Sequence, residues 1–410
     1  MKILKCKYIL CCDESFKVLE NHAIIFDKKI EKILPNDELK SLGILDSAQV
    51  FSTPIALPAL FNAHTHLEYS ANKAHLDFRG FSNWLKSVFE NRGGISKALN
   101  QKILNKEIKK LLKSGVCGIG EYSSFGLEAK MLAKSPLRSR FYCEILGTNE
   151  AFLEQAWSAF LERFKSASAL KNKRFCPALA IHSPYSTHPN LAKKALEFAK
   201  KENLLVSAHL AESKDEMEYL AGKQNELKES LSLINPAIKP LYSLGEFISM
   251  FDSDKTLFIH CVHAKSEFKN LRHIAHCPRS NRFLSSGTLD IKTAAKYANI
   301  ALGTDGLSSN LSLSIWDEMR AGIMIHKDTH LDTLARTLLL MTTKNAAKAL
   351  GFDSGEIKVG KNADIACFAL PAGSKKSRLT LDLILHTKEA KSLLIDGEKI
   401  FSKFYKNREF

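Results

Sequence analysis

The chain has 410 residues, of which 45% are apolar and 25% are charged, a balance that is ordinary for a globular protein and excludes a disordered or fibrous one. Its length allows two or three average domains, or one large α/β barrel with an appendage. The 59 Lys and Arg residues exceed the 44 Asp and Glu residues and give a net charge of +15, but the cations are spread along the chain without an arginine-rich arm, so nucleic acid is not expected as a partner.

Residues 1–54 are predicted to form short strands and turns. The opening segment, MKILKCKYILCCDESF, is interrupted by Lys5 and Lys7 and lacks a small-residue cleavage site, which favours a strand over a signal peptide. The nine cysteines of the chain are odd in number and irregularly spaced, and they form no C-x-x-C pair, a pattern typical of reduced thiols in the cytoplasm. No run of about 18 uncharged apolar residues occurs, so neither a membrane span nor a membrane partner is expected.

Residues 55–350 are predicted to form a (β/α)8 barrel. Near-continuous apolar runs indicate strands that are buried on both faces of a parallel sheet. Amphipathic stretches such as Lys102–Lys113 and Asn190–Lys201 lie between several runs, and Leu331–Leu350 is the expected closing helix. The eight runs are Ile55–His66, Val116–Tyr122, Arg140–Gly147, Phe175–His182, Leu204–Leu210, Thr256–Val262, His273–Asn281 and Asn299–Asp305.

Residues 351–410 return to short strands and turns, expected at Gly355–Ile365, Leu381–His386 and Ser392–Ile400. Both ends of the chain flank the barrel. We therefore expect residues 1–54 and 351–410 to pair into one small β-sandwich domain.

Five of the eight predicted strands carry a histidine or a carboxylate at or near their carboxyl ends. In a parallel barrel these ends meet on one face, which is where barrel enzymes place their active sites. The residues concerned are His64 with His66, His182, His209 with Glu212, His260, and Asp305.

The pair His64 and His66 points to a metal. Residues two apart on a strand point the same way, so both imidazoles can bind one ion. With His209 and Asp305 they predict a site of three histidines and one carboxylate, which suits zinc, with iron(II) or manganese(II) as alternatives. An ion held there would produce hydroxide at neutral pH by lowering the pKa of bound water. Glu212 and His260 are then expected to transfer protons and stabilise charge beside it.

These residues resemble the amidohydrolase superfamily, and the resemblance covers nearly the whole chain. It implies a distorted TIM barrel with a small β-sandwich built from both termini. Some members bridge two metals with a modified lysine on strand four; here that strand ends in AIHSPY, without lysine, which implies one divalent metal ion. The matching motifs are His64-Thr65-His66, His209-Leu-Ala-Glu212, His260, Gly303-Thr304-Asp305-Gly306 and the tail from Gly355 to Ile365.

Within the superfamily the chain is similar to nucleoside and nucleobase deaminases, and among these to the 6-aminodeoxyfutalosine deaminases of epsilon-proteobacteria. The similarity rests on HTHLEYS at 64–70, Trp84-Leu85, and HCPRSNR at 276–282. It implies hydrolytic deamination of the adenine ring of 6-amino-6-deoxyfutalosine to futalosine, with release of ammonia, in menaquinone biosynthesis. The alternatives are S-adenosylhomocysteine, 5'-methylthioadenosine or adenosine as the substrate, or another amidohydrolase reaction such as that of a chlorohydrolase.

The resemblance also implies a role for each residue. Glu212 would pass a proton to the ring nitrogen beside the attacked carbon, and Asp305 would take the proton of the metal-bound water. His260 would orient the hydroxide or polarise the developing oxyanion, and His182 would contact the substrate. The metal ligands would be His64, His66, His209 and Asp305.

Several residues are candidates for contacts to the substrate outside the metal site. A benzoate group would pair with a bidentate arginine, and the candidates are Arg140, Arg279 and Arg282. Glu68 is a candidate for ribose hydroxyls. The aromatic stretch from Ser70 to Asn100, with Trp84, is either core packing or a lid over the purine. We expect a purine nucleoside as the small-molecule partner and a homodimer as the assembly.

Two other classes of protein share part of this pattern. Zinc deaminases of the cytidine type combine H-x-E with a later P-C-x-x-C; His66-Leu67-Glu68 satisfies the first half, but no P-C-x-x-C follows. A barrel scaffold that has lost its metal is the non-enzymatic alternative. It is disfavoured because all four expected ligands and both proton-transfer residues are present, and it would purify without stoichiometric metal.

Overall fold

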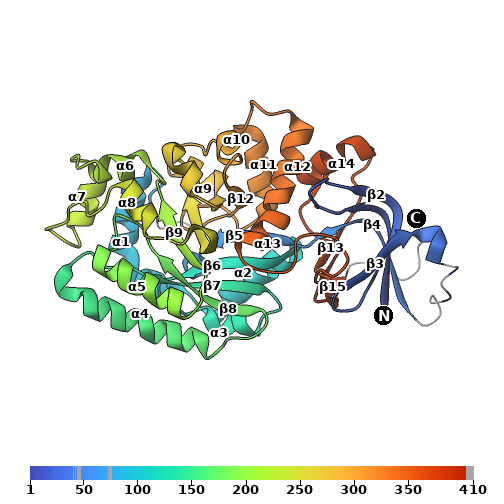
Figure 1. The fold of residues 1–410 in the computed structure, drawn as a ribbon, viewed down its shortest axis with the longest axis horizontal. Helices are drawn as coiled ribbons and strands as arrows, with labels where there is room; N and C mark the ends of the chain where they lie inside the picture. Colours follow the sequence, from blue (N-terminus) through green and yellow to red (C-terminus); the bar gives the residue numbers. More distant parts are fainter. Residues whose placement is uncertain (40, 42, 44–47, 73–75, 403–410) are drawn as a thin grey trace. The chain divides into compact units, whose positions relative to one another are not determined.

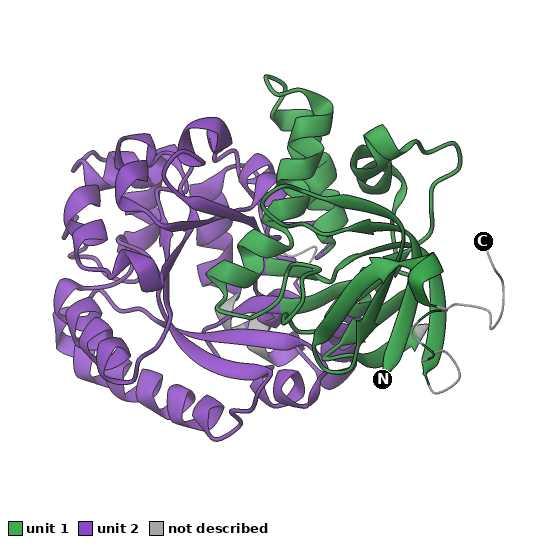
Figure 2. Ribbon diagram, turned by 45° about the vertical axis from the view of Figure 1, so that its right-hand side comes forward, with its two compact units in different colours: residues 1–62, 109–118, 314–410 green, residues 63–108, 119–313 purple. Residues whose placement is uncertain are grey.

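The computed structural model describes residues 1–39, 41, 43, 48–72 and 76–402 (Figure 1). Expectations for the terminal segments and for the stretch 70–100 that concern residues 40, 42, 44–47, 73–75 or 403–410 lie outside the described residues. The chain divides into two compact units, residues 1–62, 109–118 and 314–410, and residues 63–108 and 119–313 (Figure 2). Within the described residues, we find no helix with the length and apolar character needed to cross a membrane.

The predicted barrel strands are confirmed. In the described part of the chain, eight strands form one sheet in sequential order, and the registers given for β7 through β12 are all parallel. Each predicted apolar run overlaps one of them, although the second half of His273–Asn281 enters a helix that begins at Pro278. The strands are β5 (Leu60–Thr65), β6 (Val116–Ser123), β7 (Arg138–Ile145), β8 (Phe175–Ile181), β9 (Val206–Leu210), β10 (Thr256–His260), β11 (His273–His276) and β12 (Asn299–Leu302).

Helices follow most of these strands. For example, α4 (Leu153–Ser168) and α5 (Pro189–Lys201) pack against β7 and β8 (Figure 1). Helix α5 begins after His188, whose ring accepts from the amide of Asn190, and it has proline in its first turn, where the missing amide costs nothing. The other helices in residues 81–294 are α1 (Phe81–Ala98), α2 (Gln101–Lys113), α3 (Ala129–Lys134), α6 (Lys214–Leu220), α7 (Glu226–Ser232), α8 (Leu244–Ser249), α9 (Pro278–Phe283) and α10 (Ile291–Ala294).

Strands from both ends of the chain build a second sheet, as predicted. Among the described residues it has seven strands in the order β15-β14-β13-β4-β1-β2-β3. Strand β1 pairs parallel with β4 and antiparallel with β2, and β13 joins β4 to the C-terminal hairpin. The strands are β1 (Lys2–Leu10), β2 (Val18–Phe26), β3 (Ile30–Pro35), β4 (Gln49–Pro58), β13 (Ile365–Phe368), β14 (Ser392–Ile395) and β15 (Glu398–Ser402).

Two C-terminal expectations were wrong in detail. Leu381–His386 lies in a helix, α14 (Leu379–His386), because the apolar residues recur there at helical spacing and Arg378 bonds Asp382 four residues on. In the segment Gly355–Ile365, a strand begins only at Ile365.

The expected helix Leu331–Leu350 is interrupted. It divides into α12 (Leu331–Met341) and α13 (Lys344–Ala349), because the hydroxyls of both intervening threonines, Thr342 and Thr343, donate to the carbonyl of Leu339. The last helix of this part, α11 (Ile315–Ile325), precedes them.

Main-chain hydrogen bonds link the segment that follows β12 to the end of β5. The amides of Thr304 and Asp305 both donate to the carbonyl of His64 at 3.0 Å. Gly303 permits this approach, since a Cβ there would lie 2.7 Å from the Cβ of His64 and 3.0 Å from its amide nitrogen. Glycine is therefore required by packing, and the same packing places Asp305 beside the histidines of β5.

We expect Gly303→Ala to lower the free energy of unfolding by about 1–3 kcal/mol, the usual cost of overpacking a rigid site. The matched control is Gly245→Ala in α8, where a Cβ meets nothing within 4 Å. The control should be as stable as the parent or slightly more so. Urea unfolding of both variants measures this, and equal stability of Gly303→Ala and the parent would contradict the packing argument.

Candidate functional site

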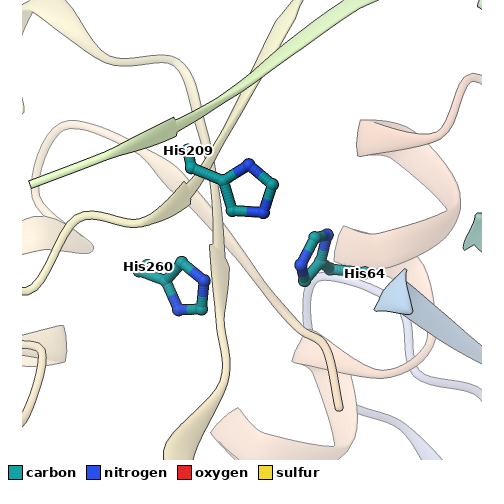
Figure 3. Close-up of side chains that lie close together, drawn as sticks. All are labelled: His64, His209 and His260. Atoms are coloured by element: carbon teal, nitrogen blue, oxygen red, sulfur yellow. The ribbon is translucent and has the colours of Figure 1, made fainter. Parts of the chain in front are cut away.

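Histidines from three strands face one another at the carboxyl ends of the barrel strands. Figure 3 shows His64 of β5, His209 of β9 and His260 of β10 turned toward the same space. The ring centroid of His64 lies 5.0 Å from that of His209 and 5.7 Å from that of His260. All three side chains are buried. The structure thus brings together residues that are almost 200 positions apart in the sequence.

Asp305 completes this group. Its Oδ1 lies 3.4 Å from Nε2 of His64 and 3.6 Å from Nε2 of His66. The four candidate ligands fall into overlapping groups whose donor atoms lie within 4.8 Å of one another. Both ring nitrogens of His64 are buried without a hydrogen-bond partner among the described residues. Buried donors left in this state, close to a carboxylate, fit a divalent metal ion.

The imidazoles are electrostatically suited to bind a cation. Burial lowers the pKa of His66 to about 4 and lowers the pKa values of His64 and His209 as well. The rings are therefore neutral at pH 7, as ligation requires. Burial alone would raise the pKa of Asp305, but the close approach of His64, aided by His66, holds it well below its usual range.

Backbone carbonyls fix the orientation of two rings. Nδ1 of His66 lies 3.1 Å from the carbonyl of Tyr122, and Nδ1 of His209 lies 2.9 Å from that of His182. A carbonyl only accepts, so each Nδ1 carries the hydrogen and each Nε2 keeps its lone pair for a metal.

The carboxylate of Asp305 is held by hydroxyls. Ser280 of α9 and Ser309 each donate to Oδ2 at 2.7 Å, while the amide of Gly306 donates to Oδ1 at 2.8 Å. Ser280 lay inside a motif recognised in the sequence, but neither serine was singled out as a site residue. Their contact to Asp305 could not be inferred from spacing along the chain.

Glu212 and His260 form a second pair beside the group. Oε2 of Glu212 lies 3.5 Å from Nε2 of His260, whose Nδ1 faces Oδ1 of Asn281 at 3.3 Å. Burial raises the pKa of Glu212 well above its usual range, and the charges of Asp305 and Glu216 add to this. This raised pKa suits the carboxyl of Glu212 to carry a proton.

The backbone at the site is strained. Ala211, His260 and Asp305 have φ values of +47°, +66° and +60°, in the left-handed region that non-glycine residues rarely adopt. Each such residue costs roughly 1–2 kcal/mol. Strain of this kind persists where the surrounding structure imposes it, and it is concentrated at functional sites.

Glu216 supports this bend and was missed in the sequence. Its carboxyl oxygens accept from the amides of Ala211 and Glu212 at 2.9 and 2.8 Å. The available signal was Ser213-x-x-Glu216, a pattern typical of a helix start, and Ser213 does cap α6 by accepting from the amide of Glu216.

The predicted substrate contacts separate into two sets. His182, Glu68 and Trp84 lie near the histidine group or its loops. The ring of His182 is 5.1 Å from that of His209, and its Nδ1 contacts Oγ of Ser186 at 2.6 Å. Glu68 is buried and accepts from the amides of Ser124 and Phe125.

The three arginines lie in different places. Arg140 is near the amino end of β7, in register with Cys176, and so lies away from the carboxyl ends of the strands. Arg279 donates to Oγ of Ser312 at 3.0 Å. Arg282 is exposed at the end of α9. The structure does not bring Arg140 or Arg282 into the histidine group.

The aromatic stretch after β5 forms α1. Phe81 and Leu85 are buried in one cluster with Tyr185, Tyr219 and residues of α7. Trp84 is partly buried, and its Nε1 donates to the carbonyl of Ser308, three residues after Asp305. This segment therefore contributes both to packing and to the loop that carries Asp305.

Buried glutamates line the neighbouring strands. Glu68, Glu121, Glu128 and Glu144 are each at most 1% exposed. Burial raises the pKa values of Glu68 and Glu121 well above their usual range and raises that of Glu128 to about 7. Glu144 was missed in the sequence, although it lies three residues before the end of the run Arg140–Gly147, a signal similar to that used for the other strands.

Glu128 predicts a pH dependence of stability. The carboxyl ionises near pH 4.3 in the unfolded chain but at about 7 in the folded protein. Between these values the unfolded state binds fewer protons, so the free energy of unfolding falls as the pH rises, by up to about 1.4 kcal/mol per pH unit for one such group.

We expect Glu128→Gln, which cannot ionise, to make this decline shallower between pH 5 and 7. Guanidinium unfolding at several pH values measures it. The exposed Glu197→Gln on α5 is the control and should follow the parent. A Glu128→Gln profile that runs parallel to the parent would contradict the assignment.

Comparisons with known proteins agree with this geometry. The model of the amidohydrolase family matches residues 55–400. An aminodeoxyfutalosine deaminase of Nitratiruptor sp. is 37% identical over 93% of this chain and 96% of its own, and an adenosine deaminase of Helicobacter pylori is 36% identical over 97% and 99%. The crystal structure of a Helicobacter pylori aminofutalosine deaminase in complex with methylthio-coformycin has a TM-score of 0.90 at 34% identity and covers 98% of this chain and 100% of that chain. The chain therefore belongs to the amidohydrolase family.

Proposed function

We propose that this protein is a hydrolytic deaminase that converts the adenine ring of 6-amino-6-deoxyfutalosine to the hypoxanthine ring of futalosine, in menaquinone biosynthesis. The observation that carries the proposal is the buried carboxyl of Glu212, whose oxygen lies within 4.8 Å of donor atoms of His260 and Asp305. Attack at C6 requires a proton on the adjacent ring nitrogen, which is only weakly basic. The names of the Nitratiruptor relative and of the Helicobacter structure support the substrate.

We assign one divalent ion, with zinc as the expected metal, to His64, His66, His209 and Asp305. The buried and unpartnered nitrogens of His64 and the free Nε2 atoms of the other two rings support this set. When bound, such an ion lowers the pKa of a water molecule enough to supply a nucleophile at neutral pH.

The residues of the chain then divide the proton transfers. Glu212 passes one proton of the water to the ring nitrogen, and Asp305 takes the second and delivers it to the amino group. The C–N bond breaks, a C–O bond forms, and ammonia leaves. His260, fixed by Asn281, faces the developing negative charge on oxygen.

A second candidate is deamination of a smaller adenosine derivative, including adenosine, 5'-methylthioadenosine or S-adenosylhomocysteine. The named activity of the Helicobacter pylori adenosine deaminase, which is 36% identical, favours it. The metal centre and the acid serve both substrates equally, because the chemistry at C6 is the same; the pocket around the nucleoside tail discriminates between them. We place either activity in the cytoplasm, since the nine cysteines are free thiols.

Purified, metal-loaded protein should release ammonia from 6-amino-6-deoxyfutalosine faster than from adenosine, 5'-methylthioadenosine or S-adenosylhomocysteine. Glu212→Gln, which cannot donate the proton, should lower kcat by about 10²–10⁴, while the exposed Glu197→Gln should retain the parent rate. Preference for another adenosine derivative would replace the substrate and keep the mechanism. Inactivity on all four compounds with metal bound would reject the deaminase.

The two serines at Asp305 generate a further prediction. Ser280→Ala and Ser309→Ala each remove a hydroxyl that orients the carboxylate, and we expect each to weaken zinc binding about 10- to 100-fold, the usual effect of such supporting groups. The matched control is Ser286→Ala, a buried serine whose hydroxyl has no partner among the described residues. Competition with a chromogenic chelator measures the affinity. Equal affinity in all three variants would show that the serines do not support the ligand.

A further inference from the structure

Glu144 lies next to the proposed metal ligands but has no role in the mechanism above. It is the second-last residue of β7, paired with Ala180 two residues before His182, and its side chain is buried. One carboxylate oxygen of Glu144 and one ring nitrogen each of His66 and His209 lie within 4.8 Å of one another. The donor atoms of His64, His66 and Asp305 lie within the same distance of one another.

The free oxygen of Glu144 indicates a missing partner. Oε2 accepts from Oγ of Ser124 at 2.6 Å, but Oε1 is buried and has no hydrogen-bond partner among the described residues. Leaving a buried carboxylate oxygen unsatisfied is costly, so native structures pair such oxygens with a donor, a water molecule or a cation. Beside two metal-binding imidazoles, a cation is the partner that the surroundings provide.

The strands on both sides of β7 organise this group. The ring of His66 is anchored to the carbonyl of Tyr122 on β6, and that of His209 to the carbonyl of His182 just after β8. Strands β6 and β8 are the two neighbours of β7 in the sheet. Both anchors use Nδ1, so each ring has a single nitrogen left for a metal.

Because each ring has only Nε2 left, the site can be tested for holding one ion or two. An Nε2 lone pair binds one ion at a time, so His66 and His209 cannot hold a second ion while they ligate the first. Glu144 therefore approaches the same ion rather than a separate one.

We propose that Glu144 is a fifth protein ligand of the divalent ion, in addition to His64, His66, His209 and Asp305. The inference rests on the metal centre of the proposed function but not on its substrate. A second carboxylate makes the centre richer in hard oxygen ligands than a tetrahedral zinc site. It consequently favours ions that accept five or six ligands, such as manganese(II) and iron(II), more than zinc alone would suggest.

The test is the metal binding of Glu144→Gln in the full-length protein. Metal-free protein is titrated with Mn2+, Co2+ and Zn2+ against a competing chelator, and the visible spectrum of the Co2+ form is recorded. We expect Mn2+ and Co2+ to bind about tenfold more weakly or worse, at least the loss known for supporting groups, with a smaller loss for Zn2+. The Co2+ bands should change toward the more intense pattern of a four-coordinate ion.

Glu128→Gln is the matched control, because Glu128 is also a buried glutamate of this region but belongs to none of the candidate ligand groups. Its affinities and its Co2+ spectrum should equal those of the parent. Circular dichroism of the metal-free proteins establishes that each variant is folded.

Unchanged affinities and an unchanged Co2+ spectrum in folded Glu144→Gln would overturn the proposal. A raised KM with unchanged metal binding would do the same and would assign the carboxylate to the substrate. If Glu144→Gln does not fold, Ser124→Ala decides by the same two readouts, because it frees the carboxylate from its one hydroxyl partner and should alter the Co2+ spectrum. The metal affinities and the Co2+ spectrum are measured without a substrate, so failure of the deaminase assignment would leave these two readouts intact.

Discussion

The carboxylate of Asp305 is held from several directions, and the geometry of the centre depends on it. Its own amide is bound to the carbonyl of His64, its Oδ1 faces the histidines of β5, and its Oδ2 accepts from Ser280 and Ser309. The left-handed backbone at this residue, with φ of +60°, is maintained by these contacts. The main-chain segment from Gly303 to Asp305 therefore both links β12 to β5 and places the carboxylate.

The sequence predicted the strands and the histidines well because both obey short-range rules. A parallel strand buried on both faces must be apolar along its length, and a ligand at its carboxyl end must interrupt that run with a polar residue. His64, His209 and Asp305 could be recognised in this way. Glu144 obeys the same rule, so the sequence contains the information needed to select it as a candidate.

Other features could not be predicted for a physical reason. Glu216, Ser280 and Ser309 act through contacts with residues brought near them only by folding. The sequence could not select one of the three arginine candidates, because arginine is common on surfaces and carries no periodic signal. Leu379–His386 is apolar over a length that fits either a strand or a helix, and the Arg378–Asp382 bond that accompanies the helix forms only in the folded segment.

The interior beside the histidines is rich in acidic residues, although the chain as a whole is basic. The whole chain carries +15, yet the described interior next to the histidines contains Glu68, Glu121, Glu128 and Glu144. Burial raises the pKa values of Glu68, Glu121 and Glu128, and the charges of neighbouring carboxylates add to this effect. The net charge thus describes the solvated surface and says little about the ligand that the interior is built to hold.

The link between α1 and the catalytic loops bears on substrate choice. Trp84 donates to the carbonyl of Ser308, three residues after Asp305, and Ser82 donates to the carboxylate of Asp215, three residues after Glu212. One helix is therefore tied to the loop of the metal carboxylate and to the loop of the acid. Because related barrels share the metal chemistry, discrimination has to come from segments that can vary without moving these two groups. Helix α1 can vary on its remaining faces, but replacing Trp84 would disturb the loop that follows Asp305, and replacing Ser82 would disturb the segment that follows Glu212.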